Sequence, residues 1–140
     1  FDLVGFFEDE YKEKVERLVE DGVVVFHGFQ PEPKPFYGIS HCVVLPSYHE
    51  GMSNVLLEAA STGRAVITSD IPGCKEVVDE GVNGYLCEKM NAGSLEECIE
   101  RFLSLGTEQR KEMGISGRKK MEAEFDKTKI VKETVEAILK

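Results

Sequence analysis

The sequence predicts an α/β protein with a doubly wound parallel sheet of the Rossmann-like kind, followed by C-terminal helices. Several short runs are apolar throughout, which is typical of strands that are covered on both faces of a parallel sheet. Segments with apolar residues at helical spacing alternate with these runs. Such alternation favours right-handed crossovers and therefore a parallel order of strands.

Five strands are predicted, at residues 1–7, 23–28, 42–45, 65–68 and 85–87. The helices predicted between them cover residues 8–21, 36–40, 53–62 and 75–79, and residues 30–35 form a proline-rich loop. Gly22 and Gly63 follow two of these helices, at the position where many helices end on a glycine. Asn83 and Gly84 indicate a tight turn before the last strand.

The chain after Ser94 has a helical pattern to its end. Ser94 and Glu97 have the spacing of a capping box. The helix they open has one apolar face, formed by Leu95, Cys98, Ile99, Phe102 and Leu103. Thr107 is the predicted cap of a further helix to about residue 124, and a last helix is expected from residue 126 or 127 to 140. This last helix carries an apolar stripe, which requires a partner surface.

A strand end, a turn and a helix start meet at residues 46–60, and their chemistry suggests an anion site. Ser53 and Asn54 are preferred N-cap types, so free amides of the first helical turn lie beside Gly51. Such a terminus carries positive partial charge and binds phosphate. Glu50 and Glu58 flank it and can accept hydrogen bonds from hydroxyl groups. A nucleotide sugar has this layout of ribose, diphosphate and hexose.

The same stretch resembles a family signature of the form Pro-Ser-x-x-Glu-Gly-x-x-x-Val-x-x-Glu-Ala, and three further blocks continue the match at residues 63–70, 73–78 and 81–86. Together the four blocks resemble the C-terminal, donor-binding domain of retaining glycosyltransferases of the GT-B fold, the family-4-like group called glycosyl transferases group 1. The resemblance covers nearly the whole chain. It implies the C-terminal half of a GT-B fold.

The resemblance also implies roles for single residues. Glu50 would be the catalytic residue that contacts the donor sugar, and Glu58 would hold the ribose. The sugar and phosphate would be bound by Gly51, Met52, Ser53, Asn54 and Val55. Phe29 and Gln30 lie where this family places contacts to the base.

By the same resemblance, the reaction would move a hexose from a nucleotide diphosphate sugar, expected to be a UDP-sugar, to an acceptor hydroxyl with retention of configuration. Neither a metal nor a cofactor is expected, since a helix N-terminus and basic side chains can stabilise the leaving diphosphate. The products would be polysaccharides or glycoconjugates.

The family has an acceptor-binding domain first, followed by a strand and a loop with basic residues that neutralise the diphosphate. No Arg or Lys precedes Lys12 here, so the chain is expected to be the C-terminal part of a longer enzyme and to be inactive alone. Residues 1–125 would form the nucleotide-sugar-binding domain. Residues 126–140 would form a helix that crosses to the missing N-terminal acceptor domain, or that mediates self-association in its absence.

Composition limits the function further. A net charge of −9 argues against nucleic-acid binding and means that the anion site must be local. No apolar run has the length of a bilayer span. The four cysteines lack zinc-site spacing and are expected to be reduced thiols, which fits a cytoplasmic protein, peripheral at the membrane in the full-length enzyme.

Other interpretations stay open at this point. The chain could be a nucleotide-sugar-binding module without catalysis or a nucleotide-sugar epimerase of the same fold, whereas a receiver domain lacks its expected aspartate after residues 42–45. His49 is expected to be an exposed loop residue, and Cys74 an inert thiol. Lys75 could reach a phosphate or pair with Glu76. The basic run at residues 118–120 is expected to be a solvated helix face.

Overall fold

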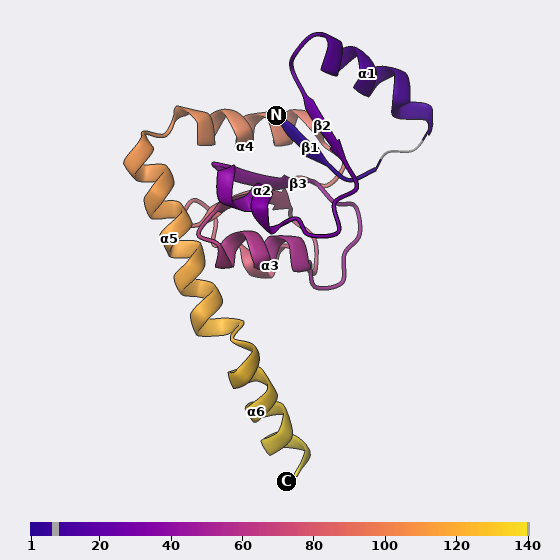
Figure 1. The fold of residues 1–140 in the computed structure, drawn as a ribbon. Helices are drawn as coiled ribbons and strands as arrows, with labels where there is room; N and C mark the ends of the chain where they lie inside the picture. Colours follow the sequence, from indigo (N-terminus) through magenta and orange to yellow (C-terminus); the bar gives the residue numbers. More distant parts are fainter. Residues whose placement is uncertain (7–8, 140) are drawn as a thin grey trace. The chain divides into compact units, whose positions relative to one another are not determined.

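The computed structural model describes residues 1–6 and 9–139, which form two compact units, Phe1–Pro35 and Phe36–Lys140 (Figure 1). The elements of the first unit are strand β1 (Asp2–Val4), the 3-10 turn η1 (Asp9–Tyr11), helix α1 (Lys12–Glu20) and strand β2 (Val25–Gly28). The second unit contains the strands β3 (Cys42–Leu45), β4 (Ala65–Ser69) and β5 (Gly84–Cys87) with the remaining helices. Helix α2 (Lys34–Ile39) begins just before the boundary.

In the first unit, α1 connects two parallel strands. Leu3 of β1 is opposite Phe26 of β2, and the His27 Nε2 atom lies 2.7 Å from the Asp2 Oδ1 atom. The predicted stop at Gly22 is confirmed, since this residue has a φ of 69° and follows the C-cap. The α-helix itself begins at Lys12 rather than near residue 8, because a 3-10 turn precedes it; Glu8 lies outside the described residues.

The expectation that β2 is covered on both faces was wrong for this unit. None of the residues of β2 is buried, and Val25 is 55% exposed. The unit contains two short strands and one helix. One helix can cover only one face of the strands, so the other face of β2 is not covered within the unit. The continuous apolar pattern predicted the strand correctly but not its surroundings.

The three strands of the second unit form a parallel sheet in the order β3-β4-β5. Val44 is opposite Ile67, and Ile67 is opposite Tyr85. The helical elements around this sheet are α3 (Asn54–Ser61), the 3-10 turn η2 (Lys75–Val77), α4 (Ala92–Ser104), α5 (Thr107–Glu124) and α6 (Lys127–Ile138). The parallel α/β architecture is therefore confirmed. The strands form two separate sheets, however, one with two strands and one with three, instead of one continuous sheet.

Each face of the three-stranded sheet has its own apolar cluster, because side chains alternate along a strand. Val66 packs with Leu56 and Ala60 of α3 and with Met121 of α5. Ala65 and its neighbours on the other face pack with α4; that cluster comprises Ala65, Ile67, Tyr85, Cys87, Cys98, Phe102 and Met113. Helices α3 and α4 accordingly lie on opposite sides of the strands (Figure 1).

Two predicted helix caps were wrong by a few residues. Asn91, not Ser94, caps α4: its side chain accepts a hydrogen bond from the Ser94 amide at 3.0 Å. The Ser94 hydroxyl instead accepts from the Glu88 amide. Likewise Gly106 is the N-cap of α5, and its amide donates to the Gln109 side chain at 2.9 Å. In the predicted apolar face of α4, Leu103 is exposed.

The expectations for the cysteines are confirmed. All four are free; Cys74, Cys87 and Cys98 are buried and Cys42 is half-buried. Burial raises the pKa of Cys42 to about 12, so this group stays a protonated thiol at neutral pH. In the part of the chain that the structure describes, no helix has the length and apolarity needed to cross a membrane. No cluster of three or more potential metal ligands is found there either.

Helix α6 begins at Lys127 as predicted, with the Asp126 side chain accepting hydrogen bonds from the Thr128 and Lys129 amides. All its described residues are exposed, including the apolar stripe formed by Ile130, Val131, Val135 and Ile138. The stripe therefore does not pack on the core of the second unit. A partner surface for it stays a prediction.

We expect this 140-residue chain to associate through α6, because the stripe loses its contact with water only in an assembly. Sedimentation should show a concentration-dependent mass, and Val135→Lys should abolish the association while leaving amide exchange in β4 unchanged. At low concentration the α6 amides should exchange much faster than those of β4. A chain that is monomeric at every concentration and equally protected in α6 and β4 would contradict this prediction.

Candidate functional site

The candidate site lies at the carboxyl edge of the three-stranded sheet, where ligands bind in open α/β folds. Pro46 follows β3 and Asp70 follows β4, so both chain segments leave the sheet at this edge. Residues 46–53 then connect β3 to α3. Glu50 lies in this loop and Glu58 lies one turn inside α3, so the helix start separates the two carboxylates along the chain.

The backbone of this loop packs against the turn at Gly73. This glycine has a φ of 86°, and a Cβ placed on it would lie 1.3 Å from the carbonyl oxygen of Gly51 and 2.9 Å from that of Glu50. The Gly73 carbonyl accepts a hydrogen bond from the Ser53 amide at 3.0 Å, and its amide donates to the Glu76 carboxylate at 2.8 Å. Only glycine allows this close contact of two backbones.

The start of α3 leaves backbone amides without acceptors inside the helix. Ser53 is the N-cap, as predicted, and its side chain accepts from the Leu56 amide at 3.5 Å. The first amides of a helix have no acceptor within the helix. Here the Ser53 amide donates to the Gly73 carbonyl instead, which leaves the amides of Asn54 and Val55 in the first turn. Asn54 and Val55 are both exposed residues.

Glu50 is half-buried, and the Ser47 hydroxyl donates a hydrogen bond to its Oε1 atom at 2.8 Å. The Cys74 side chain is fully buried near this carboxylate. Burial raises the pKa of Cys74, a side-chain hydrogen bond with Thr68 opposes that rise, and the charge of Glu50 adds to it. Cys74 is therefore an inert packing residue, as predicted, and Glu50 is held on its loop.

Glu58 is half-buried on α3, and its carboxylate has a partner on α2. The Tyr37 hydroxyl donates to the Glu58 Oε2 atom at 3.3 Å. The Tyr37 side chain is 4% exposed and packs in the apolar cluster that contains Leu56. Burial, and then the negative charge of Glu58, raise the pKa of Tyr37 to about 12. The phenol thus stays neutral and able to donate.

The other predicted site residues fall into two groups. Gly51 and Met52 are exposed on the same loop as Glu50, and a Cβ placed on Gly51 would meet nothing within 4 Å. Phe29 and Gln30 belong to the first unit, where Phe29 is 67% exposed and the Gln30 side-chain amide donates to the His27 carbonyl at 2.7 Å. Their role toward a base stays a prediction.

Charged neighbours of the site differ from expectation in two places. Lys75 pairs with Asp70 at 3.8 Å rather than with Glu76, because the Glu76 carboxylate is bonded to the Gly73 amide. The Lys120 side chain, expected to be solvated, is only 12% exposed and bridges Asp79 at 2.7 Å and Glu124 at 3.3 Å. His49 is exposed, as predicted.

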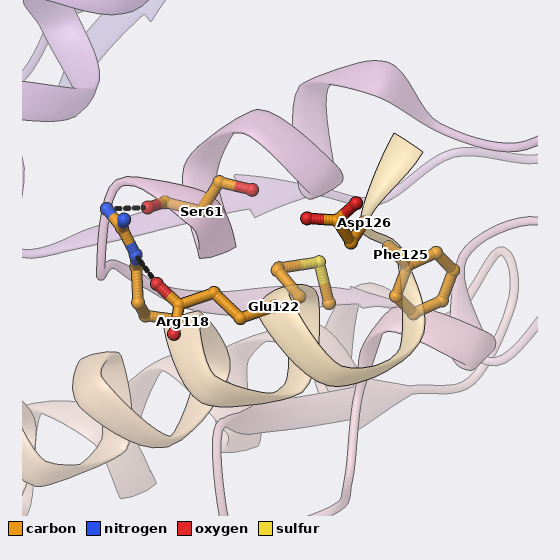
Figure 2. A pocket seen from close by; sticks show the side chains of 6 residues that line it. Ser61, Arg118, Glu122, Phe125 and Asp126 are labelled. Carbon is orange, nitrogen blue, oxygen red and sulfur yellow. Dashed lines mark hydrogen bonds and ion pairs between the residues drawn. The ribbon is translucent and has the colours of Figure 1, made fainter. Parts of the chain in front are cut away.

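The second unit has one hollow beside the site loop and one away from it. One, of about 180 Å³, is on the α4 side of the carboxyl edge and is lined by Pro46, Tyr48, Ser69, Cys87, Glu88, Met90, Asn91, Ala92 and Leu95. The other, of about 220 Å³, lies where α5 meets α6; there Arg118 bonds Glu122 and the Ser61 carbonyl (Figure 2). Neither hollow includes Glu50 or Glu58.

Sequence reasoning missed Tyr37 and Ser47, the two partners of the glutamates. Ser47 lies three residues before Glu50, and that short spacing could have suggested the contact. Tyr37 is 21 residues away from Glu58, and no local pattern links them.

Comparison with known proteins gives consistent results. The family described as glycosyl transferases group 1 matches residues 3–120. The capsular polysaccharide biosynthesis glycosyltransferase CapM of Staphylococcus aureus is 30% identical over 86% of this chain and 31% of its own length. The sucrose-phosphate synthase of Thermosynechococcus elongatus superposes with a TM-score of 0.81 at 25% identity, over 98% of this chain and 37% of its own.

A further similar structure is that of HepE from Anabaena in complex with UDP-glucose, with a TM-score of 0.74 and 25% identity, over 98% of this chain and 40% of the other. The chain thus spans about a third of the length of the first curated relative it matches. Its fold is that of the C-terminal domain of GT-B enzymes. Since the family match covers most of the residues, this chain belongs to the glycosyl transferases group 1 family.

Proposed function

We propose that this chain binds the nucleotide diphosphate sugar, a UDP-sugar, from which a retaining glycosyltransferase moves a hexose to an acceptor hydroxyl. The observation that carries the proposal is the placement of two carboxylates, each with a fixed partner, on either side of the α3 start. The family match and the UDP-glucose complex of the similar HepE structure support the choice of ligand. The acceptor would be bound by a further domain of a longer protein.

In this proposal the diphosphate lies at the start of α3. Free amides and the helix dipole place about half a positive charge there, which stabilises the diphosphate as it leaves the sugar. The net charge of −9 does not attract the ligand from a distance, so local dipoles have to supply the binding energy. The absence of a Cβ on Gly51 leaves room for the ligand against the backbone.

The two carboxylates would act on opposite ends of the ligand. Glu50, held by Ser47, would contact the hexose and orient its anomeric carbon toward the acceptor. Glu58, held by Tyr37, would accept hydrogen bonds from the ribose hydroxyls. Hydrogen bonds between hydroxyls and a carboxylate are stronger than those between neutral groups, so each glutamate should contribute measurably.

This division predicts different effects of two substitutions in the intact enzyme. Glu58→Ala should weaken binding of UDP and of the UDP-sugar alike, by about 1–3 kcal/mol, because both ligands contain the ribose. Glu50→Ala should slow sugar transfer while leaving the affinity for UDP nearly unchanged. Titration calorimetry with UDP and steady-state kinetics with the donor separate the two.

The exposed Glu96→Ala on α4 is the matched control for removing one surface charge, and it should change neither quantity. If both site variants lost affinity for UDP and for the donor to the same extent, the assignment of the two ends of the ligand would be incorrect.

A further inference from the structure

The Tyr37 phenol is a buried polar group that bonds the candidate ribose-binding carboxylate, and its effect on ligand selectivity has a testable consequence. Its ring packs against α3 in the same cluster as Leu56 and Ala59, so the side chain has little freedom. A buried tyrosine hydroxyl needs a hydrogen-bond partner, and here that partner is the Glu58 Oε2 atom at 3.3 Å. Packing therefore places a donor against one oxygen of the candidate ribose-binding carboxylate.

Helix α2 is itself fixed to the body of the second unit. The Arg64 Nη2 atom donates to the Gly38 carbonyl at 2.8 Å, and Arg64 lies in the turn between α3 and β4. The Ser40 hydroxyl donates to the Phe36 carbonyl at 2.6 Å and closes the end of the same helix. Tyr37 is thus anchored both by its ring and by the backbone on its C-terminal side.

The second oxygen of Glu58 is left available. Among the residues that the structure describes, the Oε1 atom has no hydrogen-bond partner, while Oε2 is occupied by Tyr37. An unrestrained glutamate side chain loses substantial rotamer entropy when a ligand orders it. A carboxylate that is already ordered by a buried phenol avoids most of this loss on binding.

We propose that Tyr37 is a positioning residue for ribose recognition: it holds the Glu58 carboxylate by Oε2 so that Oε1 is directed to the 2′- and 3′-hydroxyls of the nucleotide. This inference rests on the proposed function, in which Glu58 binds the ribose. It adds a residue that does not itself touch the ligand. Tyr37 thereby increases the preference of the site for a nucleotide with a vicinal diol over one without it.

The test uses the intact protein, with UDP and 2′,3′-dideoxy-UDP as probes in titration calorimetry. Tyr37→Phe keeps the buried ring and removes only the hydroxyl. It should weaken UDP about fivefold, as expected from restoring part of the rotamer freedom of Glu58, and should leave the affinity for the dideoxy nucleotide unchanged. In a Glu58→Ala background the same substitution should have no further effect on either probe.

Tyr85→Phe is the matched control, because Tyr85 is also buried but lies on the opposite face of the sheet in the cluster with Cys98. It should leave both affinities unchanged. If Tyr37→Phe weakened both nucleotides equally, or acted equally in the Glu58→Ala background, its role would be structural and the inference would be overturned.

The proposed function can be judged separately. If Glu58→Ala removed the preference for UDP over the dideoxy nucleotide while Tyr37→Phe left that preference undiminished, Glu58 would bind ribose without help from Tyr37, and only the positioning role would fail. If Glu58→Ala itself kept the preference, the ribose assignment of the proposed function would fail, and the role of Tyr37 with it.

Discussion

Gly73→Ala should abolish donor binding and lower the free energy of unfolding by about 3 kcal/mol or more. The added Cβ would lie 1.3 Å from the Gly51 carbonyl oxygen, which is a backbone atom and cannot rotate away. The φ of 86° adds roughly 1–2 kcal/mol of strain for a residue with a side chain, and overpacking adds about 1–3 kcal/mol. The loop has to move, and Glu50 moves with it. Urea denaturation and calorimetry with UDP measure the two losses.

Gly51→Ala is the companion variant that separates folding from binding. Gly51 is outside the left-handed region, and a Cβ there would meet nothing within 4 Å, so the free energy of unfolding should stay the same or rise by about 0.4–1 kcal/mol. If the ligand approaches this backbone as proposed, the affinity for the donor should still fall. Normal stability and normal binding in Gly73→Ala would show that the loop does not depend on this contact.

The local part of the fold could be predicted from sequence because each signal was local. The apolar run at residues 42–45 gave β3 with the predicted bounds, and Ser53 capped α3 as expected. Gly63 adopts a φ of 76° directly after that helix, which is the conformation expected of a terminating glycine. In these cases the residue type has one strongly preferred structural use.

Prediction failed where the sequence allowed two structures of similar energy. Asn91 and Ser94 are both good N-cap residues, and the choice depends on whether the two residues between them join the helix. Lys120 was expected to be solvated on a helix face, yet its side chain is largely covered where it pairs with the exposed carboxylate of Asp79, which is 41 residues away. Such contacts depend on tertiary packing.

The sequence likewise predicted only part of the candidate site. The spacing of Glu50 and Glu58 can be read from the sequence, but the residues that fix their positions cannot. Tyr37 of α2 contacts Glu58, and Gly73, in the turn after β4, contacts the loop that carries Glu50. The Gly73 contact exists because parallel strands bring the ends of the β3 and β4 connections to the same edge of the sheet. The Tyr37 contact depends instead on the packing of α2 against α3.

Two glycines one turn apart in α5 should respond to alanine in opposite directions. A Cβ on Gly114 would lie 2.1 Å from the Gly63 carbonyl oxygen, at the turn that ends α3. Gly114→Ala should therefore push the two helices apart and lower the free energy of unfolding by about 1–3 kcal/mol. A Cβ on Gly117 would lie at ordinary contact distances, 3.5 Å from the Asn83 Cβ and 3.7 Å from the Ala60 Cβ.

Gly117→Ala should accordingly raise the free energy of unfolding by about 0.5–1 kcal/mol, the gain in helix propensity over glycine. Both positions are buried in the same helix, so each variant is the control for the other in urea denaturation. Because Gly63 is at the far end of the helix that carries Glu58, Gly114→Ala should also weaken UDP binding, and Gly117→Ala should not. A stabilising Gly114→Ala would mean that α5 does not pack closely against the end of α3.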